Sequence, residues 1–321
     1  MKKFILFLVI MNCAISVQAQ VTTRTDTTNV VFVTYNGNSA AVEVCTNIVS
    51  YITATINGAN VKIAQSASVD STTCGEILYV LSGSSANGSF YMEGAYKASF
   101  SLVGLTLANP SGPAVDIQNG KRIKMSIKHD TESTLTDGTS AASNAWKGVL
   151  QCKGHMEFKG YGTLNVYGNY AHGIWTKEYI QVKNCTINVC KAVNDAVNCN
   201  QYFLMESGVM NLSGFGGDGI QVSKKTDSNG KVIADAENTG NFTMTGGTIN
   251  IDMTASDGDA VKIEGVQSIA AEATLNTGWK AGLEGVTSDS KDSQAKKRIV
   301  DGMLLIERNG RLYSAGGVVI K

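Results

Sequence analysis

Three aspartates recur at one point of a repeated pattern and carry the clearest chemical signal in the sequence. Asp195, Asp218 and Asp259 each precede a small residue and a β-branched one, and they recur in register with the repeat. Asp257 lies just before Asp259 and is an alternative counterpart of Asp218. If these segments stack as neighbouring strands, the carboxylates come within about 5 Å of one another. Like charges at that distance destabilise a fold unless a cation bridges them or a proton is retained.

Two kinds of chemistry fit such a column of carboxylates. Calcium takes roughly six to eight oxygen ligands and accepts backbone carbonyls from adjoining turns. One prediction is therefore a calcium site formed by Asp195, Asp218, Asp257 and Asp259. The alternative is that each aspartate caps its own turn by accepting hydrogen bonds from nearby backbone amides. The spacing alone leaves both interpretations open.

A lysine and three aromatic residues complete the candidate site residues. Lys262 follows closely after Asp259 and is a weak candidate for a catalytic base, because the acidic column offers no second basic group. Tyr179 and Tyr202 are one repeat period apart and are expected in one exposed column, with Trp175 on a different face. Flat aromatic faces suit sugar rings, although a stacked tyrosine pair is also an ordinary cross-strand contact.

The elements that position these residues recur at a fixed interval. Segments of the form Gly/Cys-x-x-Asn-apolar begin at residues 162, 185, 208 and 247, and the last interval is lengthened by a polar loop at 223–240. An apolar segment precedes each of them and another follows. This pattern predicts an all-β protein whose residues 88–265 form a right-handed parallel β-helix with three strands per rung of about 23 residues. Alternate residues then form inward apolar columns, and the asparagines form an outward ladder, Asn165, Asn188, Asn211 and Asn250.

Composition and the N-terminus indicate the compartment. The chain has 27 basic and 27 acidic residues, so its charge gives no reason to expect nucleic acid as a partner. Residues 1–19 combine Lys2 and Lys3 with a short apolar core and a small-residue cleavage site, which predicts a signal peptide and an exported protein, secreted or at the cell surface. No later stretch is apolar enough for a membrane span. The six remaining cysteines form either disulfides or buried free thiols.

The two ends of the chain depart from the repeat. Residues 20–87 are predicted to be strands that cap the N-terminal end of the stack. Residues 266–300 are expected to be a helical or irregular cap followed by a linker. Residues 301–321 read as a hairpin around Asn309 and Gly310. This hairpin is similar to the C-terminal sorting segments of type IX secretion cargo, and a last edge strand is the alternative.

The stretch from about residue 90 to 265 resembles the bacterial carbohydrate-binding domain-containing proteins. The motifs that carry the resemblance run from Asn87 to Tyr91, through the segments ending at Val166, Val189 and Gly208, to Gly217–Gln221. It implies a calcium-binding, polysaccharide-lyase-like fold that binds cellulose or polygalacturonate without established catalysis. By position, Asp195, Asp218 and Asp259 match the family's aspartate turns. Ala196 and Ala260 replace the glycine of those turns.

The function expected from residues and resemblance together is noncatalytic, calcium-assisted binding of a polysaccharide. Tyr179, Tyr202 and Trp175 are the expected sugar-contacting residues. A calcium-dependent, pectate-type lyase with Lys262 as base is the first alternative, and a structural surface protein or adhesin is the second. Fold analogy alone does not choose among them.

Overall fold

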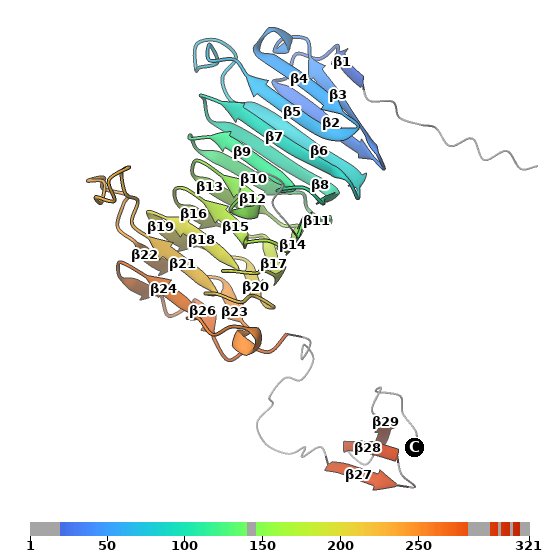
Figure 1. The fold of residues 1–321 in the computed structure, drawn as a ribbon, viewed down its shortest axis with the longest axis vertical. Coiled ribbons are helices and arrows are strands. Elements are labelled where there is room, and N and C mark those ends of the chain that lie inside the picture. The colour runs from blue at the N-terminus through green and yellow to red at the C-terminus, as the bar shows by residue number, and fades with distance from the viewer. Residues whose placement is uncertain (1–19, 140–145, 282–295, 301–302, 309–310, 315–321) are drawn as a thin grey trace, which may run out of the picture. The chain divides into compact units, whose positions relative to one another are not determined.

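The computed structural model describes residues 20–139, 146–281, 296–300, 303–308 and 311–314. The predicted signal peptide therefore lies outside the described residues. The chain divides into two units, residues 1–280 and 281–321. The described part of the first unit consists of two sheets and two short 3-10 helices, η1 (Val49–Tyr51) and η2 (Met253–Ala255). Figure 1 shows its strands stacked from β1 at one end to β26 at the other.

The larger sheet has 17 strands. They are β1 (Gln20–Arg24), β2 (Val30–Asn36), β3 (Ser39–Cys45), β6 (Ile77–Ser85), β8 (Ala98–Asn109), β10 (Ile123–Ile127), β11 (Glu132–Asp137), β13 (Met156–Gly160), β14 (Thr163–Tyr167), β16 (Ile180–Val182), β17 (Thr186–Lys191), β19 (Tyr202–Met205), β20 (Val209–Leu212), β22 (Asn241–Met244), β23 (Thr248–Ile251), β25 (Gln267–Ile269) and β26 (Thr274–Asn276). The smaller sheet has nine strands. They are β4 (Ile52–Asn57), β5 (Ala59–Gln65), β7 (Gly88–Gly94), β9 (Val115–Asn119), β12 (Gly148–Cys152), β15 (His172–Thr176), β18 (Val197–Asn200), β21 (Ile220–Ser223) and β24 (Val261–Ile263).

The predicted architecture, a right-handed parallel β-helix with three strands per rung, is wrong. The described strands of the first unit gather into two sheets instead of three separate faces. The long strand β8 is the physical reason: its residues 98–102 pair with β10, and its residues 106–109 pair with β11. It thereby joins two rows of strands that the repeat pattern had placed on different faces. The repeat period alone does not reveal a strand long enough to serve both rows.

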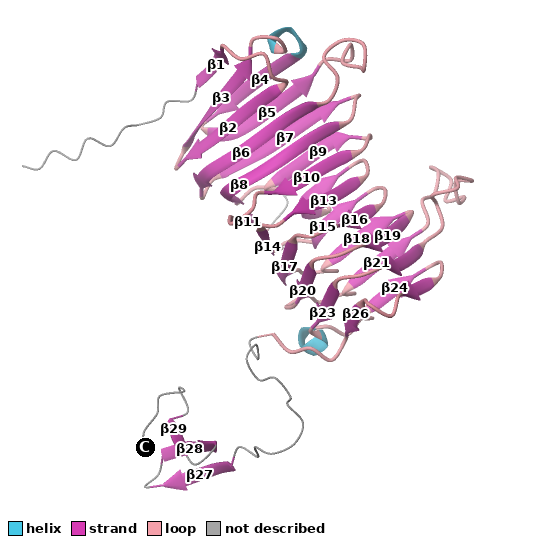
Figure 2. Ribbon diagram, turned by 180° about the vertical axis from the view of Figure 1, so that it is seen from behind, coloured by secondary structure: helices cyan, strands magenta, loops and turns pink. Residues whose placement is uncertain are grey.

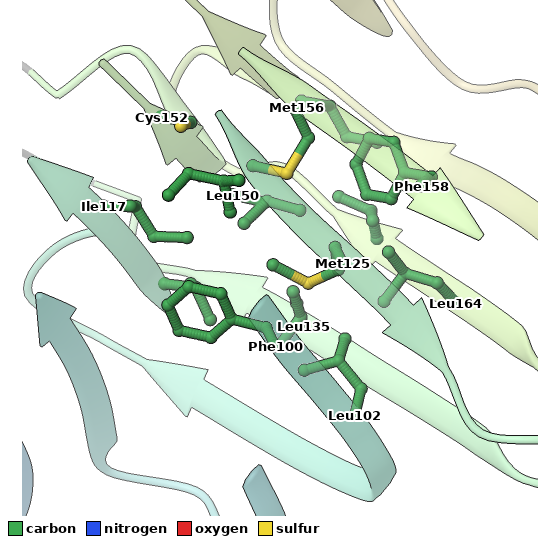
Figure 3. Packing of buried hydrophobic residues seen from close by; sticks show 14 of the residues in the cluster. Phe100, Leu102, Ile117, Met125, Leu135, Leu150, Cys152, Met156, Phe158 and Leu164 are labelled. Atoms are coloured by element: carbon green, nitrogen blue, oxygen red, sulfur yellow. The ribbon is translucent and has the colours of Figure 1, made fainter. Parts of the chain in front are cut away.

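Strand pairing in the C-terminal half follows the spacing of the sequence segments. Ile180 pairs with Phe203, one repeat further along, and Phe203 pairs with Phe242 across the inserted loop, all in parallel. These side chains point inward and are fully buried, and the rings of Phe203 and Phe242 stack at 5.2 Å. Figure 3 shows the same packing further up the core, where side chains such as Phe100, Met125 and Met156 meet between the sheets. Burial of these columns holds successive segments together.

The predicted asparagine ladder is confirmed. Asn188 donates to Asn165 Oδ1 at 2.8 Å, Asn211 donates to Asn188 Oδ1 at 2.9 Å, and Asn250 donates to Asn211 Oδ1 at 2.8 Å. Each inner amide therefore both donates and accepts along the stack. Such a continuous chain stabilises the register of neighbouring strands.

Removing one amide from the middle of the ladder tests this role. Asn211→Ala breaks the hydrogen bonds to Asn188 and from Asn250, so we expect the free energy of unfolding to fall by about 1 kcal/mol. Urea denaturation measures the change. Asn229→Ala is the control, because Asn229 is exposed in the loop after β21. Equal effects of the two substitutions would mean that the ladder contributes nothing specific.

The C-terminal end of the stack differs from the expected helical or irregular cap. Strands β25 and β26 pair in parallel with β22 and β23, so the chain adds a further, shorter layer after residue 265. In the second unit, β27 (Lys296–Val300), β28 (Met303–Arg308) and β29 (Arg311–Ser314) form an antiparallel sheet. Arg308 pairs with Arg311, so β28 and β29 flank positions 309–310. The rest of the predicted sorting segment, residues 315–321, lies outside the described residues.

The cysteines of the described residues are all free thiols. Cys45, Cys152, Cys185 and Cys199 are buried among apolar side chains. Burial raises the pKa of the Cys152 and Cys185 thiols to about 12, so these two side chains stay protonated and unreactive at neutral pH. Of the two interpretations of the cysteines, this arrangement agrees with the buried thiols.

Candidate functional site

The turn aspartates lie at one edge of the smaller sheet, just before strands β18, β21 and β24. Val197 pairs with Ile220, which pairs with Val261, so Asp195, Asp218 and Asp259 occupy equivalent positions. Asp259, and not Asp257, is therefore the counterpart of Asp218. Asp195 and Asp218 are buried, whereas Asp257 and Asp259 are exposed. Carboxylates, His172 and Lys262 together line a depression of about 510 Å³ at this edge.

Each buried carboxylate accepts a hydrogen bond from the turn of the next strand. The Asp218 N–H donates to Asp195 Oδ1 at 2.8 Å, and the Asp259 N–H donates to Asp218 Oδ1 at 2.9 Å. The backbone nitrogen of Asp195 lies 3.2 Å from Nδ1 of His172, one layer before it in the stack. The aspartates do accept hydrogen bonds from backbone amides, as the turn-capping interpretation expected. The amide, however, belongs to the next turn along the stack and not to the turn of the aspartate itself. The repeat spacing indicates that His172 and Asp195 are neighbours, because His172 lies one full period before Asp195.

The second oxygen of Asp195 is held by side chains. Asn198 donates from Nδ2 to Asp195 Oδ2 at 2.8 Å, and His172 Nδ1 lies 3.2 Å from the same oxygen. Burial by itself raises the pKa of Asp195. The contact with His172, the Asn198 amide and the Asp218 N–H together outweigh burial and hold this pKa below its ordinary value. Asp195 is therefore ionised at neutral pH.

This lowered pKa predicts a pH dependence of stability. A carboxyl group whose pKa is lower in the folded protein contributes stability above its unfolded pKa of about 3.9 and loses it as the pH falls through the folded value. We expect Asp195→Asn to lower the free energy of unfolding by about 1.5 kcal/mol at pH 7 and by progressively less below about pH 4. Urea denaturation between pH 3 and 7 measures the difference. Glu272→Gln, at an exposed position, is the control; a loss for Asp195→Asn that is constant over the whole range would contradict the prediction.

The Asp218 carboxylate is paired with Lys262. Lys262 Nζ lies 3.1 Å from Asp218 Oδ2. The hydrogen bond and charge of Asp218 raise the pKa of Lys262, so its amine stays protonated. This ion pair favours the charged amine over the neutral amine that a lyase base requires.

The calcium prediction does not fit this arrangement of side chains. Both oxygens of Asp195 and of Asp218 already have donors, and the Lys262 ammonium occupies the place of a cation beside Asp218. Across the described ranges, no group of three or more histidine, cysteine, aspartate or glutamate side chains lies where it could hold a metal ion. The repulsion between neighbouring carboxylates of the column is thus reduced by hydrogen bonds from backbone N–H groups and by the charge of Lys262.

The two predicted tyrosines are stacked but not equally exposed. The Tyr179 ring lies between His155 at 4.1 Å and Tyr202 at 4.5 Å, both nearly parallel to it, and its hydroxyl donates to Glu157 at 3.1 Å. Only 6% of Tyr179 is exposed, so the expectation of an exposed column is wrong for this residue. Both faces of its ring are covered, and neither is available to a sugar. Tyr202 is half-buried at the end of this stack.

Trp175 lies on the outer face of the smaller sheet, in one row with three polar side chains. It pairs with Asn198, which pairs with Gln221, which pairs with Lys262. We call these four residues the outward row. Asn198 Nδ2 donates to Gln221 Oε1 at 3.0 Å, so the amides are held in fixed positions. Sequence reasoning missed Asn198 and Gln221, although both recur with the same spacing, shortly after a turn aspartate.

The surface around the outward row is open on one side and covered on the other. Beyond Trp175 the next position is Gln151, which is 7% exposed. Trp175, Asn198 and Gln221 are half-buried and Lys262 is exposed. The row spans three strand spacings, roughly 14 Å. It borders the depression at the aspartate turns, because Gln221 and Lys262 belong to both.

Comparison with known proteins gives a family and a similar fold for the chain. No curated protein matches the chain. Among solved structures, the polysaccharide lyase-like protein from C. thermocellum, determined as a gadolinium derivative, matches with a TM-score of 0.57 and 19% identity, covering 77% of this chain and 99% of that one. This likeness concerns the fold alone. The family model described as "Carbohydrate-binding domain-containing protein" matches residues 57–313, which is most of the sequence. The chain therefore belongs to the carbohydrate-binding domain-containing protein family.

Proposed function

We propose that this protein is exported and binds a polysaccharide through the outward row without cleaving it. The family match over residues 57–313 is the observation that carries the proposal. The proposal of export rests on the N-terminal sequence, residues 1–19. No helix among the described residues is long and apolar enough to cross a membrane.

The chemistry of the outward row suits a chain of sugars. Trp175 offers an apolar ring face, on which the C–H face of a sugar packs. Asn198 gives its two amide hydrogens to Asp195 and Gln221, so it offers its Oδ1 as an acceptor to a sugar hydroxyl. Gln221 Nε2 donates one hydrogen to Ser223 and keeps a second one for a ligand. Their mutual hydrogen bond fixes both side chains before a ligand arrives, so little rotamer entropy is lost on binding.

The proposed contacts with the polysaccharide do not include calcium, and chelation tests whether the ion takes part. Each carboxylate oxygen of Asp195 and Asp218 already has a donor, so these two residues offer the ion no free ligand atom. We therefore expect a chelator such as EGTA to leave both glycan binding and the melting temperature unchanged. A fall of either on chelation, reversed by added calcium, would support the calcium site predicted from the sequence.

A panel of plant-type polysaccharides separates the functional alternatives. The mature protein is applied to immobilised cellulose, pectate and neutral hemicellulose, and retention is measured with and without chelator. Retention without new unsaturated uronate absorbance supports a noncatalytic binder. New absorbance that disappears in Lys262→Ala would indicate a lyase instead. A structural surface protein would be retained by none of the polysaccharides, and that result would overturn the proposal.

A further inference from the structure

A second hollow lies at the opposite edge of the smaller sheet from the aspartate turns. It has a volume of about 580 Å³ and lies among the turns that follow β7, β9, β12, β15 and β18. We call it the turn pocket and define it by the ionisable residues that line it and carry the argument, Lys97, Lys121, His155, Glu178, Asp235 and Glu237. None of the residues of the outward row lines this pocket, so the two sites are separate.

The inserted loop that lengthens the repeat folds back over the turns and forms one wall of the pocket. It follows β21, and Figure 2 shows it beside β19 and β21. Asn238 anchors it, because this residue is 6% exposed and donates to the carbonyl oxygens of Lys225 and Ile233 at 2.8 Å. The loop extends far enough back that Glu237 Oε2 lies 3.9 Å from Nε2 of His155, in the turn after β12. A wall that is already ordered loses little entropy when a ligand binds.

The floor of the turn pocket carries charges that are already matched. His155 Nε2 lies 2.6 Å from Glu178 Oε2, and Lys225 also pairs with Glu178. Burial raises the pKa of Glu178, but the hydrogen bonds and charges of His155 and Lys225 outweigh burial and hold this pKa below its ordinary value. Gln201 adds a closed part of the floor, because it is 2% exposed and its φ of +65° turns the chain inward of the surface. The two walls therefore determine which ligand fits.

The wall on the side of β7 and β9 is basic. Lys97 follows β7, Lys121 follows β9, and both line the pocket. The lysine ion pairs found among the described residues all involve other lysines. Arg122 lines the pocket too, but it pairs with Glu76, at 2.7 Å, which does not belong to the lining. Two ammonium groups without a carboxylate partner thus border the pocket on this side.

The wall formed by the inserted loop is acidic. Asp235 and Glu237 line the pocket and are exposed. Within the described ranges neither is paired with a lysine or an arginine, and the nearest polar groups are distant: Asp235 Oδ2 lies 3.5 Å from Gln201 Nε2, and Glu237 Oε2 lies 3.9 Å from His155 Nε2. The pocket therefore has two unpaired ammonium groups on one wall and two carboxylates without a cationic partner of their own on the other.

The two walls lie within reach of one small molecule. The turn that carries Lys121 and the turn that carries His155 are neighbours, since the backbone of Gly154 packs directly against the backbone of Lys121 and leaves no room for a Cβ. Neighbouring parallel strands are about 4.8 Å apart. Because Glu237 lies beside His155, the acidic wall begins about one strand spacing beyond the turn of Lys121. A molecule a few bonds long spans that interval.

We propose that the turn pocket binds a short peptide whose ammonium and carboxylate ends are both free. The carboxylate of the peptide lies at Lys97 and Lys121, and its ammonium group lies at Asp235 and Glu237. An anionic ligand is repelled by the carboxylates of the loop, and a cationic ligand is repelled by the lysines. A zwitterion is complementary to both walls at once. This inference goes beyond polysaccharide binding and does not depend on the outward row.

Isothermal titration calorimetry with three forms of one peptide tests the inference. Trialanine carries both charges, N-acetyl-trialanine lacks the ammonium group, and trialanine amide lacks the carboxylate. We expect the wild type to bind trialanine about tenfold more tightly than either blocked form, because each blocked form leaves one wall without its counter-charge. Equal affinities for the three peptides, or no binding of trialanine, would overturn the inference.

Two double variants assign each end of the peptide to its wall. Lys97→Met with Lys121→Met is expected to bind trialanine about tenfold more weakly and no longer to distinguish it from trialanine amide. Asp235→Asn with Glu237→Gln is expected to lose the distinction between trialanine and N-acetyl-trialanine instead. The reverse assignment, or a loss of neither distinction, contradicts the proposed contacts.

The controls remove the same charges outside the pocket. Lys153 is an exposed lysine of a neighbouring turn and Glu272 is an exposed glutamate, and neither lines the pocket, so Lys153→Met and Glu272→Gln are expected to bind trialanine like the wild type. All variants are expected to keep the melting temperature and the retention on polysaccharide of the wild type. If trialanine binding fails while polysaccharide is still retained, the inference fails and the proposed function stands. If polysaccharide is not retained while trialanine binds as expected, only the proposed function fails.

Discussion

Gly160→Ala is expected to lower the free energy of unfolding by about 3–5 kcal/mol. Gly160 ends strand β13 with a φ of +105°, and an added Cβ would lie 2.1 Å from the carbonyl oxygen of Ile127. Ile127 is its pairing partner in β10, so the clash is with the backbone of the sheet. The left-handed conformation costs about 1–3 kcal/mol for alanine, and relieving the overlap costs about as much again. Urea or thermal denaturation measures the loss.

Gly37→Ala separates the two contributions. Gly37 has a φ of +59° in the turn between β2 and β3, and a Cβ there meets nothing within 4 Å. Its substitution therefore adds backbone strain without a clash, and we expect a loss of about 1–2 kcal/mol. If Gly37→Ala costs as much as Gly160→Ala, the close approach between β10 and β13 is not what requires glycine.

Local pairing could be predicted from the sequence, but the arrangement of sheets could not. Apolar residues that recur with the repeat identify partners such as Ile180 and Phe203, because a displaced register would expose a whole inward column. The number of sheets depends on where the chain bends between strands. β8 continues past Gly104, where φ is +60°, and pairs with two rows, whereas the corresponding chain further on is divided into β10 and β11. This difference is one of backbone conformation, and the apolar pattern is the same in both cases.

For the candidate sites too, the repeat spacing predicted which residues lie together but not which groups they bind. Repetition of Asp195 and Asp218 correctly placed them in one column, but the charge of a carboxylate depends on its donors. Those donors are backbone N–H groups of the next turn and Lys262, and neither is visible in a list of acidic residues. Gln201 belongs to no motif, and its burial with a positive φ is known only from the structure.

The outward row allows a direct test of glycan binding. Trp175 is its aromatic residue, and it lies beside the amides of Asn198 and Gln221. We expect Trp175→Ala to weaken polysaccharide binding about 30-fold, equivalent to about 2 kcal/mol, since a buried tryptophan contact is a common hot spot of recognition. Retention on immobilised polysaccharide, or affinity electrophoresis, measures the change. The melting temperature is expected to change little, because Trp175 points out of the sheet and is only half-buried.

The control must remove an exposed aromatic ring from elsewhere on the protein. Tyr161 is 68% exposed in the turn between β13 and β14 of the larger sheet, and Tyr161→Ala is expected to bind polysaccharide like the wild type. Asn198→Ala extends the test along the row, because it removes the amide that lies between Trp175 and Gln221 and bonds to Gln221, and it should weaken binding by a smaller factor. Loss in Tyr161→Ala equal to that in Trp175→Ala would indicate unspecific aromatic adsorption. If neither Tyr161→Ala nor Trp175→Ala weakens polysaccharide binding, the binding surface is not the outward row, because Trp175 is the aromatic residue of that row.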